Sequence, residues 1–343
     1  LRFRITQNQD FLNKKIDQIM MNEKLLSTFF SFSGMSFWNG MKIKFVNMCR
    51  KRFFDASKEF ELAEKLFEKY HFSTVLILAE TGLTQQIIIS LAKKFKIPVM
   101  LLQHGLDNDS TELIKRNNFY GAPPKLSDIH SVWGTISKEC MVKSGLNKNS
   151  IFEIGNPFSD PIFNNIIKPA VYENYILFAT DPFALMNSHE LTVEFMETYA
   201  LIIKKVYEIS FKHNMKLIIK PHPQKNSNEE EIIKQIDPTI IIIKSGDILP
   251  LIKSSSLVLV TDISTVLLET QSMKKPVTSI ILRDYYGIPE SFKSNPCERI
   301  NIDELDKWVT KILTSNDFKN NVILQQTRFI DSYFANQGKA SKS

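Results

Sequence analysis

The chain has 343 residues, of which 43% are hydrophobic and 23% are charged, and its formal net charge is +6. This length fits two α/β domains of about 150 residues each, and the composition is that of a soluble globular protein. No apolar run reaches about 18 residues, which argues against a transmembrane helix. The basic residues are not interleaved with aromatic ones as in nucleic-acid-binding modules, so nucleic acid is not expected as a partner.

The cysteines indicate a reducing compartment. Cys49, Cys140 and Cys297 lie far apart and form no CxxC pair. Such a sparse, odd set argues against a disulfide framework and a zinc site, and it favours a cytoplasmic location. The first ten residues carry no signal-peptide pattern, and the start at Leu1 rather than Met fits a chain that lacks its natural beginning.

Residues 1–70 are expected to form a helical segment of their own. Apolar residues recur at three- and four-residue spacing from Phe11 to Phe30 and again from Phe54 to Tyr70. The stretch Met41–Phe54 mixes apolar and basic residues. Such a pattern fits a packed helix with a solvated basic face, and it also fits peripheral contact with a membrane, here at its inner face.

From residue 74 the pattern changes to strands that alternate with helices, which predicts parallel sheets with right-handed crossovers. The run Thr74–Ala79 (TVLILA) is expected to be a strand buried on both faces. Three further strands are expected in this part, at Pro98–Leu102, Ile129–Trp133 and Ile151–Ile154. Together they predict a first Rossmann-like domain over residues 71–165.

A second Rossmann-like domain is expected over residues 166–315. The prolines within Asn156–Val171 mark the linker before it. Its expected strands are Tyr175–Ala179, Lys216–Ile219, Thr239–Ile243, Leu257–Val260 and Pro276–Ile280. Residues 316–343 are expected to form a C-terminal helix that packs back on the first domain.

Ligands of parallel sheets gather beyond the carboxyl ends of the strands, so the residues that follow each strand are the candidate site. The strongest signal is the run Lys220-Pro221-His222-Pro223. Its two prolines fix the backbone on either side of the imidazole, and Lys220 adds positive charge for a phosphate. Thr180 follows a neighbouring strand and joins this predicted donor site. A plain turn that happens to contain a histidine is the alternative.

The segment after Leu257–Val260 is a second candidate for binding an anion. Asp262 precedes Ser264 and Thr265, where a helix is expected to begin, and free N–H groups at a helix start bind phosphate. Glu269 lies one turn further on and could accept both hydroxyls of a ribose. The simpler alternative is that Ser264 only caps the helix and Glu269 is a solvated charge.

In the first domain His104 follows a strand, between Gln103 and Gly105. A histidine of near-neutral pKa is a suitable general base for a substrate hydroxyl. Glu80 and Asp107 are competing candidates for the base. A hydrogen-bonded structural histidine is the alternative. No DxD-like metal element stands at a strand end, so we expect neither a metal nor a cofactor beyond the nucleotide-activated substrate.

Over residues 74–285 the chain resembles surface-polysaccharide glycosyltransferases of the B fold (GT-B). It is most similar to the branch that holds polysialyltransferases, capsule transferases and CDP-glycerol glycerophosphotransferases. The elements that carry the resemblance are Gln103-His104-Gly105, Trp133-Gly134, Gly155-Asn156-Pro157, Lys220-Pro221-His222-Pro223, Asp262-Ile263-Ser264-Thr265 with Glu269, and Lys275-Pro276-Val277. In that branch a His-Pro pair and a Ser-Ser/Thr pair hold the cytidine nucleotide. The resemblance therefore implies two Rossmann-like domains that face each other across a cleft, with nucleotide contacts at His222-Pro223 and Ser264-Thr265.

The same frame is also similar to non-hydrolysing UDP-N-acetylglucosamine 2-epimerases. In those enzymes the helix of the second domain begins with a Ser-Gly-Gly-type turn followed by paired acidic residues. This chain has Ile263-Ser264-Thr265 at the turn and Leu268-Glu269 at the acidic pair, and it lacks the arginine of the first-domain Glu-Ala-Gly-Leu-Arg element.

We therefore expect transfer of a sugar, or of a glycerophosphate-like group, from a nucleotide donor to a hydroxyl of a surface polysaccharide or lipid-linked glycan. A UDP-N-acetylglucosamine 2-epimerase-like enzyme is the first alternative. A non-catalytic paralogue that binds a nucleotide sugar is the second.

Overall fold

The computed structural model describes residues 2–106, 110, 125–180, 193–223, 229–282 and 287–343. It divides into two compact units, Leu1–Leu102 with Pro123–His130, and Gln103–Ala122 with Ser131–Ser343. Its parallel sheets with flanking helices confirm the predicted α/β fold class. The domain boundaries at residues 70, 165 and 315 stay a prediction.

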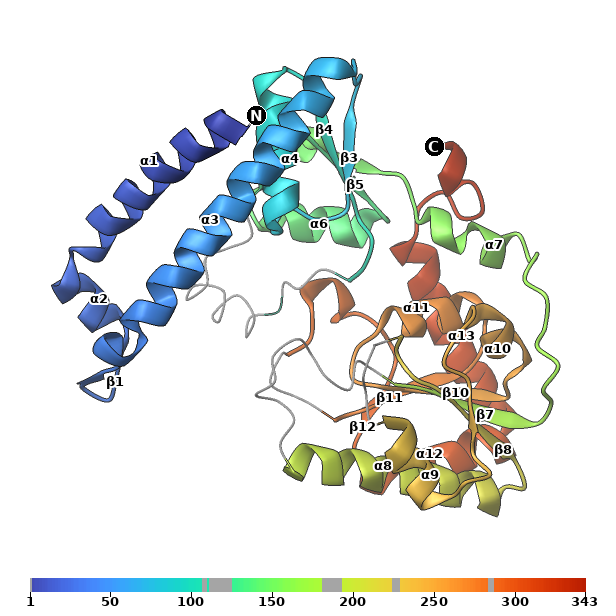
Figure 1. Cartoon of the computed structure of the whole chain (residues 1–343). Coiled ribbons are helices and arrows are strands. Elements are labelled where there is room, and N and C mark those ends of the chain that lie inside the picture. The colour runs from blue at the N-terminus through green and yellow to red at the C-terminus, as the bar shows by residue number, and fades with distance from the viewer. Residues whose placement is uncertain (1, 107–109, 111–124, 181–192, 224–228, 283–286) are drawn as a thin grey trace. The chain divides into compact units, whose positions relative to one another are not determined.

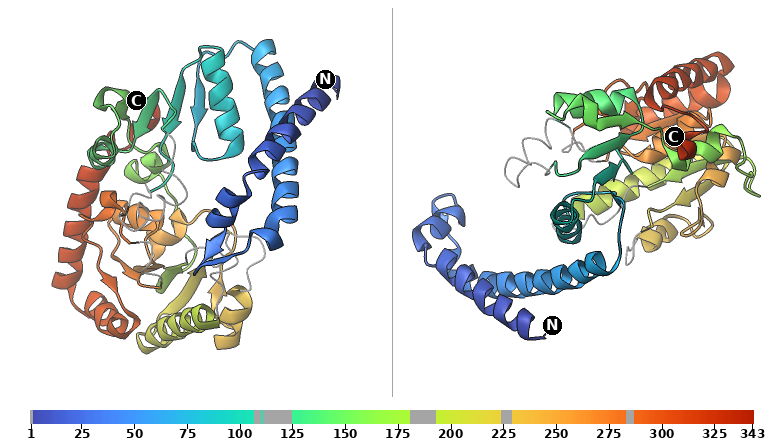
Figure 2. Two further views of the ribbon diagram at one scale, coloured as in Figure 1. Left: turned by 90° about the vertical axis from the view of Figure 1, so that its left-hand side faces the viewer. Right: turned by 90° about the horizontal axis from the view of Figure 1, so that it is seen from above.

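The first unit begins with the helical segment that the sequence predicts. It contains two long helices joined by a short helix and a two-stranded hairpin: α1 (Arg2–Met20), α2 (Glu23–Phe29), β1 (Ser31–Phe32), β2 (Met35–Ser36) and α3 (Trp38–Lys69). Helix α1 lies against α3 (Figures 1 and 2). A new helix begins after α1 because Asn22 caps the start of α2. The Oδ1 atom of Asn22 accepts the N–H of Leu25 at 3.2 Å.

A four-stranded sheet follows in the order β3-β4-β5-β6. Its elements, with the helices beside them, are β3 (Val75–Ile77), α4 (Leu83–Lys94), β4 (Val99–Leu102), β5 (Ile129–Val132), α6 (Thr135–Lys143) and β6 (Ile151–Glu153). The prediction that Thr74–Ala79 is buried on both faces is wrong. Strand β3 lies at the edge of the sheet, and Leu76 and Leu78 are 63% and 51% exposed.

The second unit contains a six-stranded sheet in the order β12-β11-β10-β7-β8-β9, and each neighbouring pair of strands is parallel. The strands are β7 (Tyr175–Ala179), β8 (Lys216–Lys220), β9 (Ile241–Ile242), β10 (Leu257–Thr261), β11 (Val277–Ile280) and β12 (Arg299–Ile300). Strands β7 and β10 are buried at every position, as their continuous apolar runs predict. Ile176 faces Leu217 on one side and Leu257 on the other.

Helices cover both faces of this sheet (Figure 1). They are α8 (Val193–Lys212), α9 (Glu229–Ile236), α10 (Leu249–Ser254), α11 (Thr265–Ser272), α12 (Ile302–Thr314) and α13 (Asn316–Tyr333). One core forms between the sheet and α8, α9 and α12, and the other between the sheet and α10, α11 and α13. Because both faces are covered, the carboxyl ends of the strands are the part of the sheet left open to a ligand.

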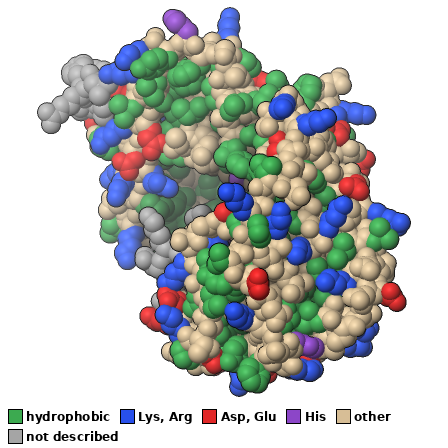
Figure 3. Space-filling model, turned by 90° about the vertical axis from the view of Figure 1, so that its right-hand side faces the viewer, with side chains coloured by type: hydrophobic (Ala, Val, Ile, Leu, Met, Phe, Trp, Pro, Cys, Tyr) green, Lys and Arg blue, Asp and Glu red, His purple; other side chains and the backbone are tan. Residues whose placement is uncertain are grey.

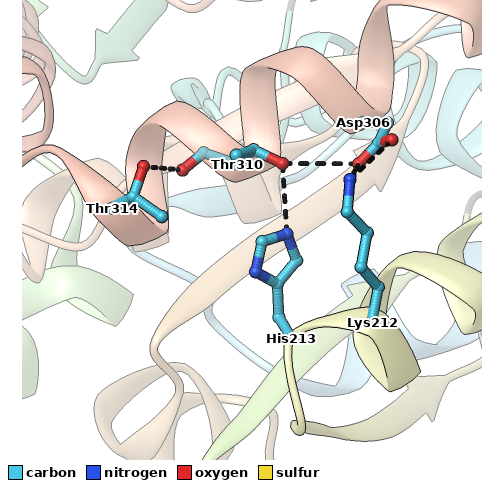
Figure 4. A network of polar contacts seen from close by, with 5 residues as sticks. All are labelled: Lys212, His213, Asp306, Thr310 and Thr314. Carbon is cyan, nitrogen blue, oxygen red and sulfur yellow. Dashed lines mark hydrogen bonds and ion pairs between the residues drawn. The ribbon is translucent and has the colours of Figure 1, made fainter.

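Polar contacts join the end of α8 to α12 (Figure 4). The ammonium of Lys212 donates to both carboxylate oxygens of Asp306 at 2.9 and 3.0 Å. Beside it, the Nε2 atom of His213 lies 3.1 Å from the hydroxyl of Thr310. These contacts lie at the opposite end of β8 from Lys220, so they hold the sheet's covering helices and take no part in the candidate site.

The end of the chain packs against the region around Trp133 and Gly155. The carbonyl of Trp133 accepts the N–H of Ala335 at 2.8 Å, and a Cβ on Gly155 would lie 2.3 Å from the carbonyl oxygen of Ala335. The predicted linker holds two short helices, η2 (Pro157–Ser159) and α7 (Asp160–Phe163). The carboxylate of Asp160 accepts the N–H groups of Ala340 and Ser341 at 3.0 and 2.8 Å. Burial raises the pKa of Asp160, but these hydrogen bonds outweigh it and the pKa is lowered.

None of the helices in the described residues is long and apolar enough to cross a membrane. On the face shown in Figure 3, the Lys and Arg side chains lie among acidic and uncharged ones.

Candidate functional site

A pocket of about 550 Å³ opens at the carboxyl ends of the central strands of the six-stranded sheet. Strands β8, β7 and β10 are parallel neighbours, so their carboxyl ends meet at one edge. Thr180 follows β7, Lys220 ends β8, and Ser264 follows β10. All three line the pocket, together with Pro221, His222, Pro223, Thr265 and Glu269. The structure thus brings most of the predicted nucleotide-binding residues together.

Lys220 brings positive charge to the pocket, and His222 adds a protonatable imidazole. Lys220 is only 7% exposed, and its ammonium donates to the carbonyl of Lys244 at 3.1 Å. Burial lowers the pKa of Lys220, although the nearby carboxylate of Asp247 raises it. The His222 side chain is open to the pocket, yet partial burial and then the charge of Lys220 lower its pKa. An imidazole in this setting gains a proton most readily when an anion arrives beside it.

The first residues of helix α11 line the same pocket. Ser264 caps it, and its hydroxyl accepts the N–H of Val266 at 3.3 Å. The helix start therefore presents backbone N–H groups and the hydroxyl of Thr265 toward the space beside Lys220 and His222. This arrangement suits a phosphate or diphosphate.

Glu269 contributes a carboxylate to the pocket in a buried setting. Its Oε2 atom is buried and has no hydrogen-bond partner in the described part of the chain. Burial, and secondarily the negative charge of Asp247, raise the pKa of Glu269 to about 7. A buried carboxylate oxygen without a donor is costly, so a ligand that brings hydroxyl donors would relieve the cost.

Thr180 is held by a buried polar cluster beside the pocket. Its hydroxyl donates to the carboxylate of Glu229 at 2.5 Å, and the hydroxyl of Tyr199 donates to the same oxygen. Burial raises the pKa of Glu229, while these two hydrogen bonds lower it. Because its proton is committed to Glu229, the Thr180 hydroxyl is left as an acceptor toward the pocket.

A second pocket, of about 460 Å³, adjoins the first. Thr265, Glu269, Asp247 and Ile248 line both. His104 lines the second pocket together with Trp133, Asn156, Phe158, Ser159, Pro161, Ile167 and Leu249. His104 and Glu269 therefore border the same space.

The backbone beside His104 is fixed by Gln103, which is 6% exposed. The side-chain oxygen of Gln103 accepts the N–H of Trp133 at 2.8 Å, and its amide donates to the carbonyl of Gly105 at 3.1 Å. The indole N–H of Trp133 closes the clamp by donating to the carbonyl of Gln103 at 3.1 Å. These hydrogen bonds fix the backbone on both sides of His104, which lines the second pocket.

Two predicted residues of the described part do not line these pockets. Asp262 has a positive φ of 50°, and its carboxylate accepts the N–H of Leu282 at 2.9 Å, so it ties down the end of β11. Glu80 belongs to the first unit, where its carboxylate accepts the N–H of Ser127 at 2.7 Å. Both carboxylates accept backbone N–H groups and neither lines a pocket, so their roles in binding or activating a substrate stay a prediction. Asp107 lies outside the described residues.

The loop after β9 was not among the predicted site elements. Asp247 borders both pockets, and Gly246 has a φ of 88°, which a side chain would disfavour. The carboxylate of Asp247 accepts the N–H of Leu249 at 3.0 Å. The signal was present, since Ser245-Gly246-Asp247 also follows a predicted strand.

Comparison with known proteins gives the fold a family. The model of the family described as UDP-N-acetylglucosamine 2-epimerase matches residues 57–294. No curated protein sequence matches the chain.

Solved structures share the fold at low sequence identity. The Staphylococcus aureus MnaA–UDP co-structure is 17% identical with a TM-score of 0.60, covering 84% of this chain and 78% of that one. A putative UDP-N-acetylglucosamine 2-epimerase from Listeria monocytogenes gives 18% and 0.58, covering 84% and 76%. The Neisseria meningitidis UDP-GlcNAc 2-epimerase bound to UDP-GlcNAc gives 17% and 0.57, covering 85% and 80%.

These findings correct the expected function. The expectation of a glycosyltransferase rested on motifs that resemble that class and on departures from the epimerase pattern, among them a turn at residues 263–265 without the two glycines and an acidic pair reduced to Glu269. The family model nevertheless spans both of these departures, and it matches well over half of the chain. The chain belongs to the UDP-N-acetylglucosamine 2-epimerase family.

Proposed function

We propose that the chain interconverts a UDP-N-acetylhexosamine and its epimer at carbon 2. Family membership gives the reaction class. The observation that carries the proposal is the junction of the two pockets at Glu269. There a buried carboxylate oxygen has no donor among the described residues, next to Lys220 and His222 in the first pocket and in the wall of the second pocket that His104 also lines.

In this proposal the UDP part occupies the first pocket. Lys220, His222 and the start of α11 would bind the diphosphate, because they supply one cation, one protonatable imidazole and free backbone donors. The unpartnered Oε2 atom of Glu269 would accept the ribose hydroxyls. The sugar would then extend toward the second pocket and His104.

The chemistry at carbon 2 follows from the leaving group. The hydrogen on this carbon is not acidic in the intact sugar, so its removal needs a second bond to break with it. When UDP leaves carbon 1 with the C1–O electrons, a base can take the C2 proton and a C1=C2 double bond forms. Return of the proton to the opposite side of C2 and of UDP to C1 gives the epimer. Lys220 and His222 would stabilise the UDP anion while it is free, which is the largest electrostatic demand of the reaction.

His104 is the proposed base, since it borders the second pocket and its backbone is clamped by Gln103. The assignment predicts that H104A abolishes turnover and leaves UDP binding intact. H71A is the matched control, because His71 is exposed and lines neither pocket.

The test is incubation with UDP-N-acetylglucosamine alone, followed by proton NMR. An epimerase needs no acceptor, so a second UDP-N-acetylhexosamine should grow to equilibrium. If UDP raises the unfolding temperature and the sugar nucleotide stays unchanged, the chain is a binding protein and the proposal fails.

A further inference from the structure

The helical hairpin of the first unit ends in an ordered tip that carries exposed apolar side chains. We define the hairpin tip as residues 21–54, which run from the end of α1 through α2, β1 and β2 into α3. Beneath its surface is a small aromatic core. Trp38 is 1% exposed and stacks on Phe30 at 5.4 Å between ring centroids, and the ring of Phe45 meets both edge-on.

Above this core the tip displays large apolar side chains. Ser33 and Gly34 both have positive φ, so β1 and β2 are joined by a tight two-residue turn. The turn sets Phe32 opposite Met35, and these side chains are 75% and 67% exposed. Eight more apolar side chains of the tip are exposed: Met21, Leu25, Phe29, Phe37, Met41, Ile43, Met48 and Phe53. So many on one short segment mark an interaction surface.

The same segment holds most of the chain's excess positive charge. It contains six basic residues and one acidic residue, Glu23, which gives +5 of the +6 carried by the whole chain. Lys42 pairs with Glu23, and Arg50 pairs with Asp17 at 2.7 Å. The other four basic residues are exposed and have no acidic partner in the described part of the chain: Lys24, Lys44, Lys51 and Arg52.

We propose that the hairpin tip docks on the surface of an anionic lipid bilayer, with Phe32 and Met35 inserted among the headgroups. Exposed apolar side chains flanked by lysine and arginine are the combination that an interfacial element requires. A second copy of the chain is a poorer occupant, because two tips of charge +5 would repel each other.

The test is co-sedimentation of the full chain with vesicles. One set contains phosphatidylcholine alone, and the other contains about one third phosphatidylglycerol. We expect binding to the anionic vesicles only, and its loss in high salt. F32S/M35S should lower the partition coefficient about a hundredfold, about tenfold for each side chain. K44A/K51A/R52A should lower it by a similar factor, about fivefold for each charge.

F211S is the matched control, since Phe211 is 78% exposed on α8, outside the hairpin tip. It should bind vesicles like the unaltered chain, and circular dichroism checks that every variant is folded. Failure of the unaltered chain to sediment with anionic vesicles overturns the proposal, as does equal binding by F32S/M35S. Light scattering measures the molar mass and so tests self-association. If the unaltered chain is a dimer that binds no vesicles, and F32S/M35S is a monomer, the tip is a dimer interface and the proposal is overturned.

Discussion

Replacing Glu269 by Gln should stabilise the empty protein and weaken UDP binding. Burial raises the pKa of Glu269 from an ordinary 4.5 to about 7. Because folding raises this pKa, Glu269 does not lower the free energy of unfolding below about pH 4.5, where it is protonated in both states. The free energy of unfolding then falls as the pH rises from 4.5 through 7. At 1.36 kcal/mol per pKa unit, the ionised form costs at most about 3 kcal/mol at pH 8.

Glutamine has nearly the same shape and carries no charge. E269Q should therefore unfold at a temperature several degrees higher than the unaltered chain at pH 8, with little difference at pH 4.5. The carboxylate is also the group proposed to accept the ribose hydroxyls. UDP should consequently raise the unfolding temperature of the unaltered chain and have a smaller effect on E269Q.

Differential scanning calorimetry with and without UDP measures both effects. E139Q is the control, because Glu139 is exposed and lines neither pocket. If E269Q is less stable than the unaltered chain at pH 8, or if UDP stabilises both equally, then the idea of an ionised, unpartnered carboxylate awaiting a ligand is refuted.

Three further variants test other parts of the account. H222A should weaken UDP binding about tenfold, because one charge-assisted contact to the diphosphate is lost. Calorimetric titration measures the dissociation constant, and an unchanged value would mean that His222 contacts no phosphate. In the unaltered chain the lowered pKa of His222 predicts proton uptake on UDP binding at pH 7, seen as a buffer-dependent binding enthalpy that H222A abolishes. T180V should destabilise the protein by about 1–3 kcal/mol in urea unfolding, since Glu229 loses a donor while buried, and an unchanged midpoint would contradict this. D160A should lower the free energy of unfolding by a similar amount, because the N–H groups of Ala340 and Ser341 lose their acceptor. The C-terminus should then be cleaved faster by a protease, and an unchanged cleavage rate would count against this role of Asp160.

The sequence predicts the second unit well because its signals are local and strong. Continuous apolar runs define β7 and β10, and the polar residues after them meet because neighbouring strands are parallel. The histidine between two prolines is likewise a local signal, and it lies in the pocket as that pattern suggests. Ser264 caps α11 where its residue type predicts a helix start.

Other features depend on information that a local pattern does not hold. TVLILA predicts a strand, yet its place at the edge of the sheet, which exposes Leu76, is decided by strand order. Asp262 and Glu80 follow strands just as His222 does, and only the positions of distant N–H groups direct their carboxylates to Leu282 and Ser127. The function was misjudged because short motifs resembling glycosyltransferases, and several local departures from the epimerase pattern, were weighed above the match over most of the chain.

Removal of the carbon 2 proton is the step on which the proposed inversion of configuration at that carbon depends, and solvent exchange measures it. The chain is incubated with UDP-N-acetylglucosamine in heavy water, and the sugar nucleotides are analysed by NMR and mass spectrometry. The account predicts deuterium at carbon 2 of the newly formed epimer, and later of the starting material, with none in the presence of H104A. An epimer that keeps its original hydrogen, or a substrate that neither exchanges nor changes while UDP is bound, would contradict the account.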